Sequence, residues 1–264
     1  MADSDVVYVA VAPKDKLEAG LAEKVASIVG KDLFGTRVLL NSKIPRILGH
    51  YSTIQAAESI AEKLRSLGLV AVVCHRNELC QPSSVRLRAH TLKVNGGEIT
   101  FWAKGRQERV IAAERVFLIL QGTLRTHVER EITRTKREIN LAAMALTGIP
   151  MMRKVEDKTK EQSNQTEDFA RVYGWTSPEP MVEILQNGFD YSSLGKKKAL
   201  SSLENMNIVV AELRSTFPAA VFDGRLTKRF TVDVPFATPL DEIEINSKLI
   251  YLCHRAVSGP GPAA

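Results

Sequence analysis

Residues 156–168 read EDKTKEQSNQTED, a stretch without a single apolar side chain. Such a segment has no apolar surface to bury on folding, so we expect it to stay solvated, within a disordered region over 153–170. It divides the chain into parts whose hydrophobic patterns are typical of small folded modules. The predicted class is α+β, with a small α/β sandwich module followed by an antiparallel β module with a C-terminal capping helix. A helix and the disordered polar insertion split this second module.

The composition is that of an ordinary globular protein, with 44% hydrophobic and 25% charged residues in a chain of 264. The first residues, MADSD, lack the basic start of a signal peptide, and apolar runs such as Leu69–Cys74 are too short to span a bilayer. Three cysteines, an odd number, do not form a disulfide framework. We therefore expect a cytoplasmic protein with no membrane span.

The net charge of +6 and the pI of about 9.2 permit contact with an acidic partner. Most basic residues have acidic neighbours in the sequence, and the exceptions are the run Lys196–Lys198 and the pair Lys228-Arg229. A lysine run of this length is more often a solvated turn than a phosphate or nucleic-acid site, and the solvated turn is the favoured interpretation.

The first module is predicted over residues 1–80. A strand over 6–12 precedes a helix over 17–28 that ends at Gly30, and a short helix covers 33–40.

A third helix has a clear start, because Ser52 and Gln55 have the spacing of a capping box, and it ends at Gly68. A buried strand over 69–74 follows. The order strand, helix, short helix, helix, strand predicts a small sheet with helices on one face.

Within the run Leu33–Val73, a set of apolar and small residues recurs at fold-determining positions, namely Val38, Ile44, Pro45, Ser52, Ala56, Ala57, Ile60, Leu64, Gly68, Val70 and Val72. With these positions the run resembles the C-terminal domain of the bacterial ribosomal stalk protein and the similarly folded adaptor of the Clp protease, and a bacterial source is expected. The resemblance implies a fold whose members bind other proteins through a helix face or a shallow pocket. Of the basic surface of the stalk domain, this chain has Lys31, Arg37, Lys43 and Arg46, of which the last two are candidate partner-binding residues.

A second module is predicted over 84–218, interrupted by an insertion over 123–175. Its first half alternates apolar and polar residues with the period of a half-buried strand, and Asn95-Gly96-Gly97 is a strong tight-turn signal. The strands expected there cover 85–88, 92–94, 98–103, 110–111 and 116–120.

After the insertion we expect a strand over 181–185, a turn at Asn187-Gly188 and a return strand starting at 189–191. A helix with a capping box at Ser201 and Glu204 then runs to Pro218. Strands followed by one amphipathic helix resemble, in element order, a bacterial pleckstrin-homology-like domain.

Inside the insertion, a helix is predicted over 124–146, because Val128, Ile132, Thr135, Ile139, Ala142 and Leu146 recur at spacings of four and three. This helix packs on the protein's own sheet or, in the alternative interpretation, mediates self-association. Arg130, Arg134 and Arg137 are candidate contacts to a partner or to a phosphate backbone, although glutamates interleave with them.

The C-terminal segment, 219–264, is predicted to hold strands near 230–234 and 242–252 and a disordered tail from residue 258. The hydrophobic pattern does not indicate how this segment packs.

Five residues have side chains that bind zinc, but their spacing forms no CxxC knuckle and no HExxH pair. They are Cys74, His75, Cys80, Cys253 and His254. The favoured interpretation is that the cysteines at 74 and 253 are core residues, and a zinc-stabilised protein is the weaker alternative.

No phosphate-binding loop and no nucleophile elbow occurs in the sequence. We therefore predict a protein that is not an enzyme and needs no cofactor, namely a protein-binding adaptor or regulatory protein. The alternative is an RNA- or ribosome-associated binding protein, favoured by the pI.

Overall fold

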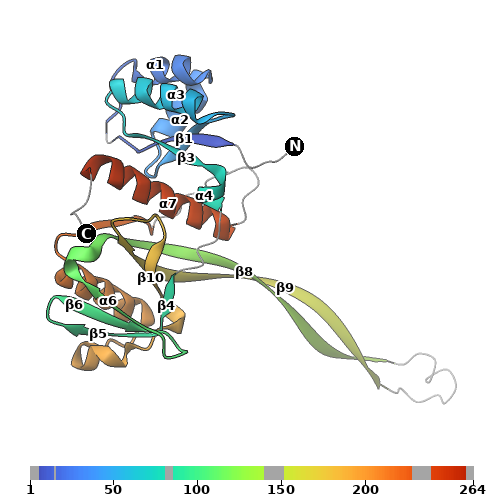
Figure 1. Ribbon diagram of the computed structural model, residues 1–264. Coiled ribbons are helices and arrows are strands. Elements are labelled where there is room, and N and C mark those ends of the chain that lie inside the picture. The colour runs from blue at the N-terminus through green and yellow to red at the C-terminus, as the bar shows by residue number, and fades with distance from the viewer. Residues whose placement is uncertain (1–5, 15, 81–85, 140–151, 228–238, 260–264) are drawn as a thin grey trace. The chain divides into compact units, whose positions relative to one another are not determined.

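The computed structural model describes residues 6–14, 16–80, 86–139, 152–227 and 239–259 (Figure 1). The chain divides into two compact units, one formed by residues 1–124 with 167–264 and the other by residues 125–166. Helices and three sheets confirm the α+β class, with a helix at the C-terminal end. The module boundaries expected at 80, 84 and 219 stay predictions.

The N-terminal sheet has the strand order β2-β1-β3, and both outer strands are antiparallel to β1. The strands are β1 (Val7–Val11), β2 (Arg46–Tyr51) and β3 (Ala71–His75). The first and last strands confirm the sequence prediction. The middle strand, which begins directly after Pro45, was not predicted, although a proline is well placed at the start of a strand.

Three helices pack on one face of this sheet, and all three were expected: α1 (Leu21–Val29), α2 (Leu33–Leu40) and α3 (Ile54–Ser66). Gly30 ends α1 with a left-handed φ of 66°. The cap of α3 is Thr53, whose hydroxyl accepts from the amide of Ala56, and not the neighbouring Ser52. The side chains of β1 that face α1 and α3 form one core with them.

The second face of this sheet is covered by the long helix α7 (Pro239–Ser258) and the short helix α4 (Arg76–Cys80) (Figure 1). Ile245, Leu249 and Cys253 of α7 pack against Val72 and Cys74 of β3. The strand prediction over 242–252 is therefore wrong.

The strand prediction over 242–252 failed because α7 is buried on two sides. Ile250 and Tyr251 pack against a second sheet, in a cluster with Phe117, Leu118 and Tyr173. Apolar residues on both sides of a helix blur the 3.6-residue period that distinguishes a helix from a strand.

This second sheet has the strand order β11-β8-β9-β10-β4. It is mixed, because β11 runs parallel to β8 and β10 runs parallel to β4, so it is not the purely antiparallel sheet expected. Its strands are β4 (Leu87–Ala89), β8 (Val116–Ile139), β9 (Met152–Gly174), β10 (Pro180–Leu185) and β11 (Val221–Leu226).

The face of this sheet away from α7 packs against a separate antiparallel meander and helix α6 (Ser202–Thr216). The meander and α6 are confirmed; its strands are β5 (Thr91–Asn95), β6 (Glu98–Trp102) and β7 (Glu108–Ala112). The return strand at 189–191 is wrong, since Tyr191 starts the 3₁₀ helix η3 (Tyr191–Lys197) and its ring is buried in the core. Two further 3₁₀ turns are η1 (Ala113–Arg115) and η2 (Gln186–Gly188).

The helix predicted over 124–146 is wrong as well, because β8 continues as a strand to Ile139. The disorder predicted over 153–170 is also wrong, because this stretch belongs to β9, a hydrogen-bonded neighbour of β8. Backbone pairing between neighbouring strands satisfies the peptide groups whatever the side chains are, so a polar composition does not exclude it. Residues 140–146 of the predicted helix, the strand expected at 230–234 and the tail beyond 259 lie outside the described residues.

Gly122 of β8 is required by close packing. A Cβ at this position would lie 2.5 Å from the ring of Phe169 and 2.7 Å from the Cβ of Leu226, on the two neighbouring strands. In the part of the chain that the structure describes, no helix combines the length and the apolar character needed to cross a membrane.

Candidate functional site

A row of alternating charges crosses three strands of the five-stranded sheet. Glu183 of β10 stands directly opposite Arg88 of β4 and Arg171 of β9 in the strand register. Residues in register on adjacent strands point to the same face, so this arginine–glutamate–arginine row follows from the topology. Its neighbours Val182 and Ile184 point to the other face, into the core shared with α6.

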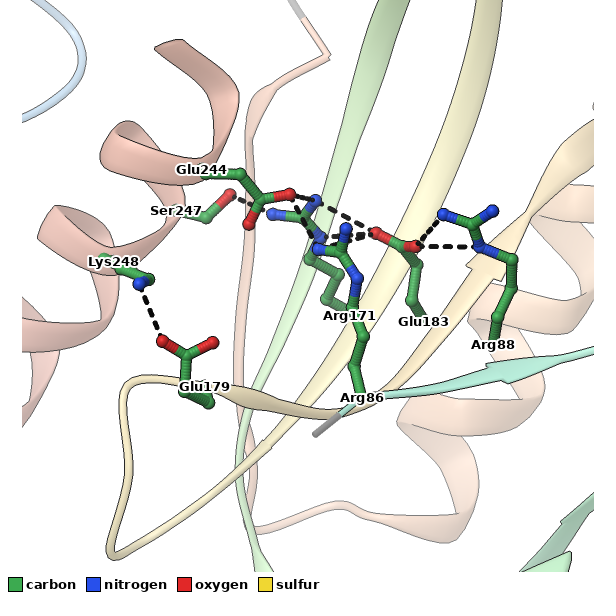
Figure 2. Close-up of polar contacts among 8 residues, drawn as sticks. All are labelled: Arg86, Arg88, Arg171, Glu179, Glu183, Glu244, Ser247 and Lys248. Atoms are coloured by element: carbon green, nitrogen blue, oxygen red, sulfur yellow. Dashed lines mark hydrogen bonds and ion pairs between the residues drawn. The ribbon is translucent and has the colours of Figure 1, made fainter. Parts of the chain in front are cut away.

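Helix α7 adds a second layer to this row. Arg171 donates from Nε to Oε1 of Glu183 at 3.0 Å and from Nη1 to Oγ of Ser247 at 2.9 Å, and a third bond reaches Glu244 (Figure 2). Arg86 lies between the two carboxylates, 2.7 Å from Glu244 and 3.3 Å from Glu183. The sheet and α7 are thus joined by a continuous ionic network.

Burial makes this network unusual. The side chains of Arg171 and Glu183 are each only 1% exposed. Charged groups are rarely buried to this extent unless they are paired and hydrogen-bonded. The neighbouring Lys248 of α7 is also buried; it lies 2.6 Å from Oε1 of Glu179 and donates to the carbonyl of Glu78 in α4 at 2.7 Å.

The pKa directions of two members, Arg171 and Glu244, favour their charged forms. Burial acts against the charge of Arg171, but the surrounding Tyr173, Glu244 and Glu183 outweigh it, so the pKa of this arginine is raised. Burial also acts against the charge of Glu244, yet Arg171 and Arg86 hold its pKa below the usual range. Because both carboxylates are engaged by arginines, the network is suited to fixing α7 on the sheet and not to proton transfer.

A second polar cluster joins β11 to α7. Asp223 is buried, and its Oδ2 lies 2.8 Å from Nε2 of His254 and 2.8 Å from Nε of Arg225. Burial raises the pKa of Asp223, but hydrogen bonds from His254 and Arg225 more than offset this and keep it well below the usual range. Arg225 bonds both oxygens of this carboxylate, so Asp223 acts as an anchor for the arginine and the histidine.

The thiols of Cys74 and Cys253 lie in the core between β3 and α7, and burial raises the pKa of each to about 12. Cys80 is exposed. Within the described ranges, no three His, Cys, Asp or Glu side chains are placed so that they could hold a metal ion. The zinc alternative, which also involved His75 and His254, therefore has no donor set in this part of the chain.

The sequence-predicted binding residues are divided between the two units. Lys43 is exposed in the loop before β2, and Arg46 begins β2, where its Nε donates to Oγ of Ser42 at 2.8 Å. Burial lowers the pKa of Arg46, and Glu242 partly offsets this. The other three candidates, Arg130, Arg134 and Arg137, belong to β8 in the second unit, so the helical spacing that grouped them does not apply.

The structure also reveals a surface that the sequence analysis missed. Helix α2 buries Thr36 and Leu40 and leaves Phe34 79% and Val38 57% exposed. Two residues correspond to about 200° around a helix, so the pair at 34 and 38 lies opposite the buried pair. In the sequence this face is visible only as two apolar residues at i, i+4 spacing. Recognising the pair as exposed requires knowing which side of the helix is buried.

Basic side chains accompany this face. Lys31 and Arg37 are exposed, and a nitrogen of the Arg37 guanidinium lies 3.8 Å from a carboxylate oxygen of Glu23 in α1. The carboxylate of Asp32 is engaged as the N-cap of α2, where it accepts from the amide of Gly35 at 2.7 Å. The exposed face of α2 thus combines two large apolar side chains with a basic edge.

Searches of protein-family models, of curated proteins and of solved structures found no match to this chain.

Proposed function

We propose that this chain is a protein-binding adaptor or regulatory protein without catalytic activity, and that the exposed face of α2 binds the partner. The observation that carries the proposal is the exposure of Phe34 and Val38 one turn apart on a helix whose other side is firmly packed. Single exposed apolar residues are common on protein surfaces, whereas adjacent large ones are typical of interaction sites.

The chemistry of this face favours one kind of partner. Burying a phenylalanine or valine side chain that is otherwise exposed contributes about 1.5–3 kcal/mol, so the pair supplies the core of a modest interface. Lys31 and Arg37 at its edge favour carboxylates on the partner. An amphipathic helix with an apolar stripe and acidic flanks satisfies both requirements.

The buried polar groups support a role without catalysis. Glu183 and Glu244 are ion-paired with arginines, and Asp223 is ion-paired with Arg225 and hydrogen-bonded to His254. A general acid or base must be able to exchange a proton with a substrate. These carboxylates are instead bonded to arginine and histidine side chains of the protein itself.

The test is affinity capture of the tagged full chain from its native cell extract, with and without ribonuclease. The wild-type chain is compared with the Phe34→Ser/Val38→Ser variant. A Val94→Ser/Val110→Ser variant is the matched control, since these valines are exposed on β5 and β7.

We expect a stoichiometric protein that survives ribonuclease, is lost with the α2 variant and is retained by the control. A partner retained equally by both variants would refute the assignment to α2. Recovery of RNA or ribosomal proteins that disappears with ribonuclease would instead favour the RNA-associated alternative.

A further inference from the structure

The end of η3 and the loop that follows it, residues 196–200, expose three lysines and a leucine close together in the chain, and this segment is called the loop below. Lys196, Lys197 and Lys198 are all exposed, and Leu200 is 107% exposed, which means that its side chain protrudes fully from the surface. Leu203, in the first turn of α6, is 49% exposed. The lysine run noted in the sequence is therefore combined with an apolar tip.

Leu200 is held in this position by the backbone on both sides of it. The buried side-chain amide of Asn205 accepts from the amide of Ala199 at 2.7 Å and donates to its carbonyl at 3.0 Å. On the other side, Ser201 caps α6 by accepting from the amide of Glu204 at 3.1 Å. The leucine is presented by a loop with defined hydrogen bonds and not by a fraying end.

The exposure of Leu200 departs from the usual start of a helix. A hydrophobic residue just before the N-cap commonly packs against the fourth helical residue, which here is Asn205. Because the amide of Asn205 turns inward to hold Ala199, Leu200 has no apolar partner at that position.

The three lysines differ in their partners. Gly195 has a φ of 53°, a left-handed value that turns the chain just before the run. Lys197 lies 3.1 Å from Glu212 of α6, and the charge of Lys198 acts on Asp190, whereas Lys196 forms no ion pair with any of the residues that the structure describes. The loop is therefore a basic surface with an apolar tip.

We propose that this loop docks the protein on an anionic lipid surface, with Leu200 and Leu203 entering the acyl boundary and the lysines contacting headgroup phosphates. A nucleic-acid backbone would use the lysines alone and leave a protruding leucine without a role. A lipid surface uses both, because the methylene stem of lysine lies along apolar surface while its ammonium group stays at the headgroups. This inference is independent of the α2 face.

The proposed contact is weak and reversible. Each lysine near an anionic surface raises the partition coefficient about fivefold, and insertion of one leucine raises it about tenfold. Because the lysine contribution is screened over a Debye length of about 8–10 Å at physiological ionic strength, binding decreases as salt is added.

The experiment is co-sedimentation of the full chain with vesicles of phosphatidylcholine alone or mixed with phosphatidylglycerol. We expect sedimentation only with the anionic vesicles and a decrease with added salt. Leu200→Ser should lower the partition coefficient about tenfold, and Lys196→Gln/Lys198→Gln by at least as much. All substituted side chains are exposed, so the thermal unfolding midpoint should stay unchanged.

Two control variants distinguish this loop from general surface effects. Val94→Ser removes an exposed apolar side chain on β5, and Lys24→Gln/Lys63→Gln removes two exposed charges on α1 and α3; both should bind as the wild type does.

Three results would overturn the proposal. The first is absence of sedimentation with anionic vesicles at low salt, and the second is an equal loss in the control variants. The third is a loss in the lysine variant while Leu200→Ser binds normally, which would identify a simple anion or nucleic-acid contact.

Discussion

Replacing Arg171 with methionine should destabilise the protein far more than the loss of an ordinary ion pair. The substitution keeps a long side chain but removes bonds to Glu183, Glu244 and Ser247 from a site that is 1% exposed. Removing one partner of a buried ion pair costs about 3–5 kcal/mol, because the remaining charge stays buried without compensation. Arg86 still contacts both carboxylates, so we expect the lower end, about 3 kcal/mol.

A double-mutant cycle measures the coupling between Arg171 and Glu183. In Arg171→Met/Glu183→Leu the two buried charges disappear together, and the Arg86–Glu244 pair at 2.7 Å remains. Arg88 loses Glu183 but is 64% exposed, so water solvates it. We expect the double variant to lose only about 1 kcal/mol, which corresponds to a coupling energy of at least about 2 kcal/mol between the two sites.

The assay is urea unfolding of the full chain at neutral pH, followed by tryptophan fluorescence. Trp175 is a suitable probe, since its ring lies 4.6 Å from that of Phe117 and under the guanidinium of Arg255 of α7. Lys197→Met is the control. It removes the ion pair with Glu212, in which the lysine is 69% exposed, and should cost less than about 1 kcal/mol.

Two results would refute the argument. One is a loss below about 1 kcal/mol for Arg171→Met, which would mean that the network contributes no more than a surface pair. The other is a double variant whose loss equals the sum of the two single losses, because independent sites add and coupled charges do not.

Gly122→Ala should lower the free energy of unfolding by about 1–3 kcal/mol, because the new Cβ would overlap neighbouring side chains. The control Gly97→Ala should be nearly neutral, because a Cβ at that position meets nothing within 4 Å. Urea unfolding of both variants measures the difference. Iodoacetamide on the native protein should label Cys80 alone, and all three cysteines only after unfolding, as mass spectrometry of intact chains would show. The pKa values of Glu244 and Asp223 are lowered in the folded protein, so on acidification these carboxylates are protonated first in the unfolded chain, which is thereby favoured. The urea midpoint should therefore stay constant above about pH 4.5 and fall below it. A flat profile down to about pH 3 would contradict these low pKa values.

The elements that the sequence predicted correctly are those that depend on local signals. The strand β1, the three helices α1 to α3, the meander and α6 each have a regular period and, for the most part, a recognisable cap or turn. Gly30 is an example, because a left-handed C-cap is a property of the residue and its immediate neighbours. Periodicity works for the helices and the meander because each packs mainly one face, whereas β1 packs on both faces and is recognisable as a short apolar run.

The two largest failures, at β9 and α7, have a shared cause, namely that a distant segment of the chain determines the structure of each. The polar stretch 156–168 is a strand because β8 is its hydrogen-bonded neighbour, and α7 shows a mixed pattern because it packs on two sheets. The candidate sites show the same division. The lysine run at 196–198 was visible in the sequence, but the exposure of Leu200 beside it and the outward face of α2 were not.

By itself, the sequence determined the α+β class, most of the single-faced helices and strands, and the basic character of the chain, since these depend on composition and on local side-chain periodicity. Only the tertiary structure decided the pairing of β8 with β9, the burial of α7 between two sheets and the network around Arg171. Buried charges need partners from three strands and a helix that are far apart in the chain, and such contacts form only when the whole fold is assembled.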